Sequence, residues 1–305
     1  MGMNGKSNLR CRDAADERQY MLSGDYEVYE KVGEPIGAVA FHYHDFYELI
    51  YIMEGEFSSL IEDRAVRMRK GDFLLIDKNV MHKYHPTERE MDSSRRNILW
   101  ISDQMLMELA EGEPLLTECF LGVGPKLYHF PIYYEEILRG FLMKLAMSEI
   151  LEGTDTQSTG IRKVMDRGNL SLFFGYLNVL CKREEYLSST QEIVDHPLVE
   201  QVTGYIETHL SQEITVEEVA EAVHMSKYHF LLNFKEITGM TVHNFIVNKR
   251  IIFACQAMAE GKNITESWQQ TGFADYSSFL RNFRKIYGIS PREYRENNRS
   301  LIISQ

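Results

Sequence analysis

The sequence predicts an α+β multidomain protein with an N-terminal β-barrel, a helical connecting segment and a C-terminal all-α domain. Three observations support this fold class. Short β-rich runs separated by Gly, Pro, Asn or Asp fill residues 26–102. Apolar residues at helical spacing recur through residues 103–190. After residue 195 one twelve-residue pattern occurs twice, as FLLNFKEITGMT and FLRNFRKIYGIS.

The composition argues against several classes of protein. The 305 residues carry a formal net charge of −12, which is unlike a protein that coats nucleic acid through its overall charge. Basic residues nevertheless outnumber acidic ones from Lys227 onwards. We therefore expect any contact with an anionic polymer to involve that part of the chain.

The N-terminus and the cysteines indicate a cytoplasmic protein. The first twenty residues contain no apolar run, and no uncharged stretch reaches the length of a membrane span. Cys11, Cys119, Cys181 and Cys255 have neither paired nor metal-type spacing, which is typical of a reducing compartment. We expect residues 1–25 to be a loose leader and the protein to have no membrane partner.

Residues 26–102 are expected to form an all-β barrel or jelly roll. Runs such as EVYEKV, YELIYIM, FSSLIED and FLLID supply the strands. Side chains alternate between the two faces of a strand. On this basis Phe46, Ile50 and Ile52 should line the barrel, whereas Tyr43, Tyr47 and Tyr51 should lie on the opposite face as outer or interface residues.

Four polar residues in this block form a spaced pattern. His42-x-His44-x3-Glu48-x6-Gly55 comes first, and His82 follows Gly71 by eleven residues. On continuous strands, His42, His44 and Glu48 would point to one face. The pattern resembles the two motifs of cupin barrels, so the predicted barrel is cupin-like.

The four residues His42, His44, Glu48 and His82 are the candidates for binding a small effector. Together they also offer a mixed nitrogen and oxygen set that suits a divalent transition metal. Our expectation is a pocket without a metal or other cofactor, because histidine has several roles besides ligation. A metal held by the same four residues is the alternative.

Residues 103–190 are expected to form a helical connector. One apolar stripe includes Leu138, Leu142 and Leu145, and a second runs from Ile161 to Leu180. A helix pair of this kind is either part of the core or a dimerisation surface, and both interpretations stay open.

The repeat predicts two helix-turn-helix units within residues 195–299. In each copy Phe, Phe and Ile at i, i+4 and i+7 form one apolar stripe, and Gly239 or Gly288 ends the helix. Thr215 and Glu218 have capping-box spacing before the first copy. Such a unit places its second helix in the major groove of DNA.

The C-terminal third resembles the DNA-binding domain of the AraC/XylS family of bacterial transcription regulators. The matching positions are Ile214, Val219, Ala220, Ser226, Phe234-Lys235, Gly239, Arg250, Ala254, Gly272-Phe273 and Gly288-x-Ser290-Pro291-x-x-Tyr294-Arg295. The resemblance implies that one rigid helix, about residues 242–258, joins the two units. It also implies that the barrel senses a small molecule, often a sugar in this family.

With the phenylalanines turned inward, eleven residues are candidates for DNA contact. They are Lys227, Tyr228, Leu231, Leu232 and Lys235 in the first copy, and Tyr276, Ser277, Leu280, Arg281, Arg284 and Lys285 in the second. Arg281 suits a guanine edge, and Tyr228 or a leucine suits a thymine methyl group. Lys235, Arg284 and Lys285 are better placed for phosphates. The family usually has a polar or basic residue where Leu232 stands.

We therefore expect a sequence-specific regulator of transcription rather than an enzyme. Its expected partners are double-stranded DNA, a small-molecule effector such as a carbohydrate, a second copy of the chain and RNA polymerase. One alternative is a metal-dependent cupin enzyme with a helical C-terminal scaffold. Another, suggested by Leu232 and Trp268, is a family member that reads no bases and acts through a protein partner.

Overall fold

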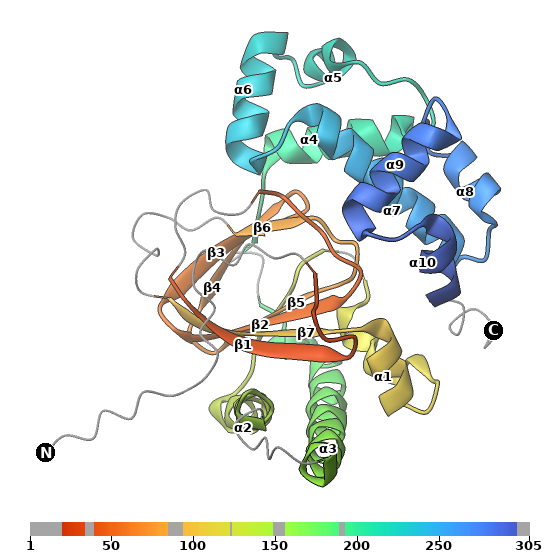
Figure 1. Cartoon of the computed structure of the whole chain (residues 1–305). Coiled ribbons are helices and arrows are strands. Elements are labelled where there is room, and N and C mark those ends of the chain that lie inside the picture. Colours follow the sequence, from red (N-terminus) through yellow and green to blue (C-terminus); the bar gives the residue numbers. More distant parts are fainter. Residues whose placement is uncertain are drawn as a thin grey trace, which may run out of the picture. The chain divides into compact units, whose positions relative to one another are not determined.

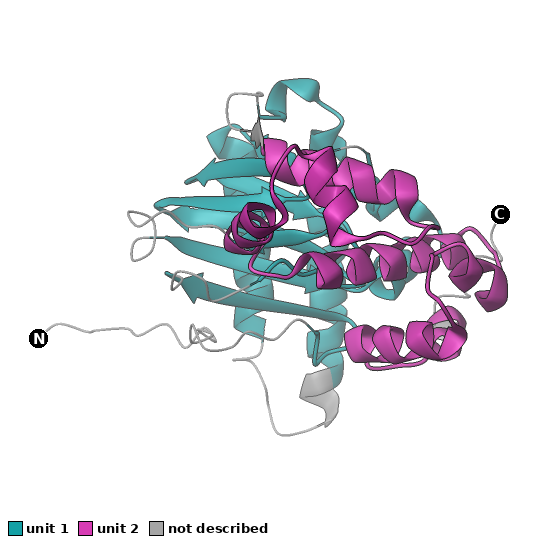
Figure 2. Ribbon diagram, turned by 90° about the horizontal axis from the view of Figure 1, so that it is seen from above, with its two compact units in different colours: residues 1–194 teal, residues 195–305 magenta. Residues whose placement is uncertain are grey.

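The computed structural model describes residues 20–33, 40–84, 94–122, 124–148, 156–188 and 193–297. Most of the expected leader, residues 1–25, thus lies outside the described residues. The chain divides into two compact units, residues 1–194 and 195–305, which Figure 2 colours separately. Each unit is described by itself.

Unit 1 contains two β-sheets (Figure 1). The five-stranded sheet has the order β1 (Tyr26–Val32), β7 (Arg95–Ile101), β2 (Tyr47–Glu54), β5 (Asp72–Ile76) and β8 (Lys126–His129). The four-stranded sheet has the order β6 (His82–Tyr84), β3 (Glu56–Ile61), β4 (Arg64–Arg69) and β9 (Ile193–Asp195). The pairings within β1, β7, β2, β5 and β8, and those of β3 with β4 and β6, are antiparallel.

The two sheets form a sandwich rather than a closed barrel. Among the described residues the sheets remain separate hydrogen-bonded sets, so the predicted β-rich domain is confirmed but its closure is not. Strand β8 lies within residues 103–190, a segment expected to be helical, and pairs with β5. Residue Leu127 of β8 contributes to the sandwich interior, so this strand is part of the core.

Strand β2 explains why the unit has two apolar cores. Ile50 and Ile52 face the interior of the sandwich, as predicted. Tyr47 and Tyr51 point the other way and are 2% and 1% exposed. Of the two positions expected for these tyrosines, outer surface or interface, Tyr47 and Tyr51 have the interface position, because a second layer covers that face of the sheet.

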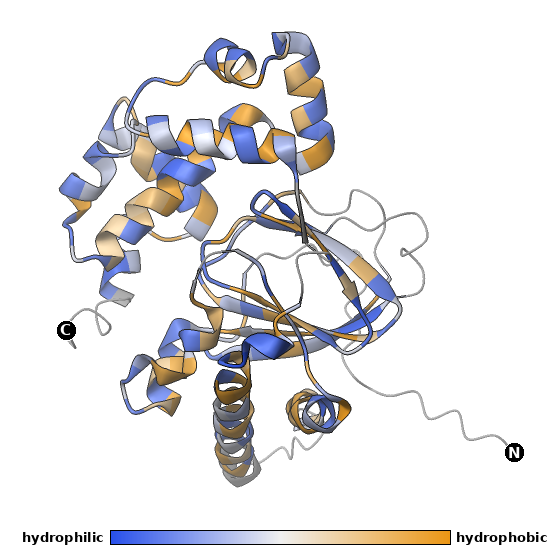
Figure 3. Cartoon of the chain, turned by 180° about the vertical axis from the view of Figure 1, so that it is seen from behind, coloured by the Kyte–Doolittle hydropathy of each residue, from blue (hydrophilic) through white to orange (hydrophobic). Residues whose placement is uncertain are grey.

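Helices provide the second layer. They are α1 (Asp103–Leu109), α2 (Ile132–Ser148) and α3 (Thr156–Cys181), with 3₁₀ turns η1 (Pro114–Leu116), η2 (Glu118–Phe120) and η4 (Glu184–Tyr186). Leu138, Leu142 and Phe173 are completely buried in the cluster that contains Tyr47 and Tyr51. One face of α2 and α3 is therefore core, although hydrophobic residues recur along the rest of α3 (Figure 3).

After Asp195, the last residue of β9, the regular elements in the described part of unit 2 are all helices. Its helices are α4 (Pro197–His209), α5 (Val216–Ala222), α6 (Lys227–Thr238), α7 (Val242–Ala259), α8 (Ile264–Gln269), α9 (Tyr276–Tyr287) and α10 (Pro291–Asn297). The predicted capping box of Thr215 and Glu218 is present. Gly239 and Gly288 end α6 and α9 in the left-handed conformation, as predicted.

Two further findings concern the described residues as a set. Cys119, Cys181 and Cys255 form no disulfide. None of the helices in the described part combines the length and the apolar character needed to cross a membrane.

Candidate functional site

The first helix-turn-helix unit consists of α5, a short turn and α6. The turn contains His224 in the left-handed region, with φ of 55°. Phe230 and Phe234 on α6 are completely buried. Because α6 is a regular helix, burial of these two side chains fixes which residues form its outer face.

The outer face of α6 carries most of the residues predicted there. Lys227, Tyr228, Leu232 and Lys235 are exposed, whereas Leu231 is half-buried. The sequence analysis missed His229, which is also exposed. Its position next to Tyr228 at the start of the helix was the available signal.

The outer face of α9 is more polar. Tyr276, Ser277, Arg281, Arg284 and Lys285 are exposed, as the prediction requires, and Leu280 is half-buried like its counterpart Leu231. Asp275 caps the helix by accepting a hydrogen bond from the Ser278 backbone (2.8 Å).

Trp268 packs at the edge of the apolar core of the second unit. Its half-buried ring packs against the apolar cluster of Phe279 and Phe283. It also lies 5.9 Å from the ring of Tyr276, measured between centroids. The completely buried residue of α8 is Ser267, whose hydroxyl donates to the Asn263 carbonyl. The larger Trp268 side chain is therefore accommodated beside the tightly packed position rather than in it.

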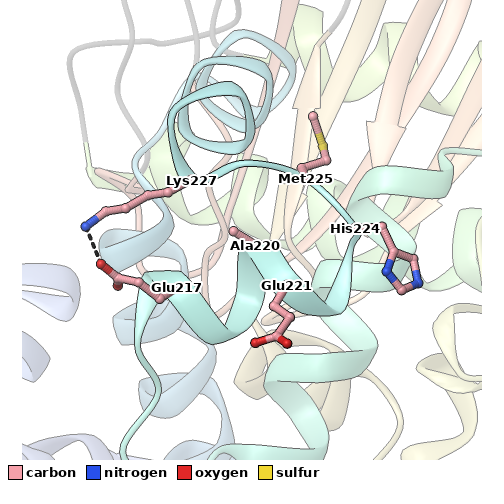
Figure 4. Close-up of a pocket in the computed structure, with 6 residues that line it drawn as sticks. All are labelled: Glu217, Ala220, Glu221, His224, Met225 and Lys227. Carbon is pink, nitrogen blue, oxygen red and sulfur yellow. Dashed lines mark hydrogen bonds and ion pairs between the residues drawn. The ribbon is translucent and has the colours of Figure 1, made fainter.

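A hollow lies beside the start of α6 (Figure 4). It is lined by Glu217, Ala220, Glu221, His224, Met225 and Lys227. The Lys227 ammonium forms an ion pair with Glu217, and both side chains are more than half exposed. An exposed ion pair contributes at most about 1 kcal/mol, so Lys227 can exchange Glu217 for a phosphate at little cost.

In unit 1 the structure brings His44, Glu48 and His82 together in the interior of the sandwich. Their potential ligand atoms all lie within 4.8 Å of one another. Glu48 projects from β2, His82 begins β6 in the other sheet, and His44 precedes β2. All three side chains are buried. The structure thus groups three of the four residues predicted to lie together.

His42 and Tyr84 border this cluster. The ring of His42 lies 4.2 Å from that of His82 and 6.2 Å from that of His44, between centroids. The Tyr84 hydroxyl donates to Glu48 Oε1 at 2.6 Å. Sequence reasoning missed Tyr84, although it lies two residues after His82 and such residues share a strand face.

The histidine rings are oriented by backbone carbonyl groups. His44 Nδ1 lies 2.8 Å from the Phe46 oxygen, and His82 Nδ1 lies 2.9 Å from the Val80 oxygen. Since a carbonyl oxygen only accepts hydrogen bonds, each Nδ1 must carry the proton. In the neutral form, each Nε2 then has only a lone pair to present.

Those lone pairs face a carboxylate. His44 Nε2 and His82 Nε2 lie 3.0 and 3.2 Å from Glu48 Oε2. The His82 Nε2 atom has no hydrogen-bond partner among the described residues. If both rings are neutral, three acceptors converge at one point, and a cation placed there would satisfy all three.

The environment of His44 favours its neutral form. Burial lowers the pKa of His44, against the opposing effect of its contact with Glu48. Burial alone would raise the pKa of Glu48, but hydrogen bonds from His44 and His82, donated when their Nε2 atoms carry a proton, hold the Glu48 pKa well below the usual value. A neutral His44 beside an ionised Glu48 is the protonation state in which a divalent metal is bound. The donor set therefore fits a transition metal.

Two known domain families match the chain. The "AraC-like ligand binding domain" matches residues 33–142, and the "Helix-turn-helix domain" matches residues 219–297. The β-sandwich and the tandem helical units together define a transcription regulator with a ligand-binding domain and a DNA-binding domain. The chain belongs to the AraC family. This family consists of regulators, not enzymes, so the metal-dependent enzyme is not the function of this protein.

Relatives that align over most of their own length are also named as transcription regulators. The "Probable transcriptional regulator LumQ" of Photobacterium leiognathi is 25% identical over 257 residues, covering 83% of this chain and 91% of its own. The "HTH-type transcriptional activator RhaS" of Salmonella arizonae is 23% identical over 268 residues, covering 88% and 91%. Fatty-acid-bound ToxT of Vibrio cholerae aligns over 90% of this chain and 95% of its own, at 14% identity. Its TM-score is 0.35, which does not establish a common fold.

Proposed function

We propose that the protein recognises a specific DNA sequence with α6 and α9 and that a small molecule bound in the β-sandwich controls this recognition. The observation that supports it best is the duplication. Both helices follow a short helix and a tight turn, and both expose the same positions of the repeat. Such a unit places its second helix in the major groove.

The length of α7 suits simultaneous binding by both units. Its 18 residues span about 27 Å at about 1.5 Å per residue. Successive major grooves on one side of B-DNA are about 34 Å apart. Because one chain carries both units in a fixed order, we expect an asymmetric site rather than a palindrome.

Selection of bound fragments from random DNA tests this proposal. Arg281→Ala should weaken binding to the selected site by about 1–3 kcal/mol and relax the preference at one base pair. Arg284→Ala should weaken all sequences alike and reduce the salt dependence, because phosphate contacts carry no sequence information. Arg292→Ala on α10 is the matched control. Enrichment of no sequence at moderate salt would refute the proposal.

We further propose that the effector is a small polyhydroxylated molecule such as a sugar. The buried imidazole and carboxylate groups of His44, Glu48 and His82 offer hydrogen-bonding partners for hydroxyl groups. The ring of Trp100 lies 6.2 Å from that of His44, so its fluorescence can report binding there. In a Trp268→Phe background, a panel of sugars should include one that changes both Trp100 emission and DNA affinity. A panel without effect would contradict the proposal.

The converging acceptors support a second proposal, that His44, Glu48 and His82 hold a divalent transition metal. Bound there, the ion would join the two sheets and offer a Lewis-acidic contact to an effector oxygen. Titration with Zn²⁺ after chelator treatment should show one equivalent bound per chain. Glu48→Gln and His44→Ala should remove this binding, whereas His229→Ala, which removes an exposed histidine of α6, should not. Unchanged stoichiometry in His44→Ala would refute it.

We also propose that the protein is a homodimer formed through the outer face of α3. Met165, Leu172 and Val179 recur every seven residues and are 50%, 54% and 63% exposed. Ile161, Gly168 and Gly175 fall between or beside them with the alternating spacing of three and four that is typical of a helix-pairing stripe. RNA polymerase remains a proposed partner on the basis of the family alone.

A further inference from the structure

The two recognition helices differ at one equivalent position. The repeat offset of 49 residues, visible in Phe230 and Phe279, makes Leu232 the counterpart of Arg281. Both residues are exposed on the outer face of their helix. The duplication therefore provides an internal comparison, in which the same place on the same kind of helix carries an apolar side chain in one unit and a guanidinium in the other.

Leu232 is part of an apolar surface on α6. Tyr228 lies four residues earlier, so the two side chains are neighbours on one face of the helix. They are 71% and 51% exposed. Lys235 on the same outer face is exposed as well, and it provides a positive charge beside the apolar surface. Exposed apolar side chains beside a basic residue suit a partner that is anionic overall but also carries apolar groups.

DNA offers one such feature in the major groove. The C5-methyl group of thymine is the only methyl group on the base edges there. A leucine placed against a guanine, cytosine or adenine edge would instead cover hydrogen-bonding groups without satisfying them, which is unfavourable. Leucine at this position thus selects thymine both by contact and by rejection of the other bases.

We infer that α6 reads thymine methyl groups through Leu232 and Tyr228, while α9 reads guanine through Arg281. This inference rests on the proposed recognition of DNA by both helices, and it adds which chemical groups of the bases each helix recognises in its half of the DNA site. The bound site should then have a T·A pair under α6 and a G·C pair under α9.

Replacement of thymine by uracil tests the inference, because uracil lacks only the methyl group. In the selected duplex, each thymine is replaced in turn by deoxyuridine and the dissociation constant is measured. At one position or two adjacent positions in the half under α6, wild-type binding should weaken about fourfold, the effect of losing one buried methyl group. Leu232→Ala should bind the thymine and uracil duplexes equally at that position.

A second measurement tests the difference between the two units. Leu232→Arg should change the preferred base at the same position from thymine to guanine in a random-DNA selection, because arginine then stands in both copies. Arg281→Ala should keep the sensitivity to uracil under α6 while losing the guanine preference under α9. Leu232 is exposed, so these substitutions leave the core of the unit unchanged.

Three outcomes would be decisive against the inference. If wild-type protein binds every uracil duplex as tightly as the thymine duplex while Arg281→Ala still loses its guanine preference, the thymine reading is wrong and the proposed function stands. If no sequence is selected at all, the proposed function itself fails. If Leu232→Ala binds DNA normally but abolishes transcription in a reconstituted assay, the apolar surface contacts a protein instead.

Discussion

At the scale of single residues, Asn79 forms a backbone hydrogen bond that helps to position the cluster of His44, Glu48 and His82. It follows β5 in a tight turn and has a left-handed backbone, with φ of 64°. Its backbone N–H donates to the His44 carbonyl at 2.7 Å, and His82 begins β6 three residues later. The turn therefore connects the backbone of His44 to the start of β6, and this helps to keep the His44 and His82 side chains close together.

Substitution of Asn79 should reveal this role. Asn79→Gly should fold normally, because glycine adopts positive φ freely. Asn79→Val should destabilise unit 1 by at least about 1–2 kcal/mol, since a β-branched side chain is strained in the left-handed region. Urea unfolding followed by Trp100 fluorescence, in a Trp268→Phe background, measures both. Equal stability of the two variants would contradict a strained turn.

Asp77 in the same turn should give unit 1 a pH-dependent stability. Burial raises its pKa to about 6, although the Lys78 backbone hydrogen bond and side chain oppose the shift. The unfolded carboxyl titrates near 3.9. Between about pH 4 and pH 6 the folded state therefore binds more protons than the unfolded state, so stability should fall as the pH rises.

The check is a comparison of Asp77→Asn with the wild-type protein. The variant lacks the titrating group, so its unfolding midpoint should decline less between pH 4 and pH 6, and it should be the more stable protein at pH 7. Parallel pH profiles for the two proteins would show that Asp77 has an ordinary pKa.

At the scale of elements, the turn of the second helix-turn-helix unit depends on one glycine. Gly272 has φ of 72°, and a Cβ atom there would lie 2.3 Å from the Leu210 carbonyl oxygen. Gly288 has the same φ of 72°, but no atom of the described residues lies within 4 Å of its Cβ position. The two positions share the backbone requirement and differ only in the available space.

Alanine substitutions at Gly272 and Gly288 distinguish the free-energy cost of a strained backbone from that of a steric clash. Gly288→Ala should destabilise unit 2 by about 1–2 kcal/mol, the cost of a left-handed alanine. Gly272→Ala should cost about 1–3 kcal/mol more, because the Leu210 backbone must also move. Trp268 fluorescence in a Trp100→Phe background reports unfolding of this unit. Similar losses for the two variants would refute close packing at Gly272.

The sequence predicted the helical elements more reliably than the sheets. The repeat of phenylalanines and the capping residues of α5, α6 and α9 are local signals, so they determined these helices closely. For Tyr47 and Tyr51 the choice between outer surface and interface stayed open, because alternation on a strand does not show whether helices cover the second face. That information lies in α2 and α3, far along the chain.

The candidate ligand cluster was predicted from an argument that is only partly correct. The spacing of His42, His44 and Glu48 was read as one continuous strand, yet among the described residues His42 forms only an isolated bridge with His82. The residues meet because β6, which pairs with β3 in the other sheet, also forms a bridge through His82 to His42, in the segment that precedes β2. The convergence of lone pairs could not be predicted either, because it depends on carbonyl groups that orient the rings.

At the scale of the whole molecule, the outer face of α3 is the feature that the chain's own fold does not explain. Gly168 and Gly175 lie inside the helix, where each costs about 1 kcal/mol relative to alanine. Among the described residues, nothing lies within 4 Å of either Cβ position, so neither glycine makes room for a neighbour in that part of the chain. Glycines in a stripe with Met165, Leu172 and Val179 would instead allow a second helix to approach closely.

If two copies pair along this stripe, Leu172 is buried twice in each dimer. Full burial of a leucine contributes about 1.5–3 kcal/mol, and Leu172 is already about half-buried (54% exposed), so its two copies together contribute about 1.5–3 kcal/mol and Leu172→Glu should weaken dimerisation by at least about tenfold. Leu115, which is 57% exposed in η1 and outside the stripe, provides the control as Leu115→Glu. Sedimentation equilibrium should show a wild-type and Leu115→Glu dimer but a Leu172→Glu monomer. A dimer that persists in Leu172→Glu would place the interface elsewhere, and the glycines of α3 would then need another explanation.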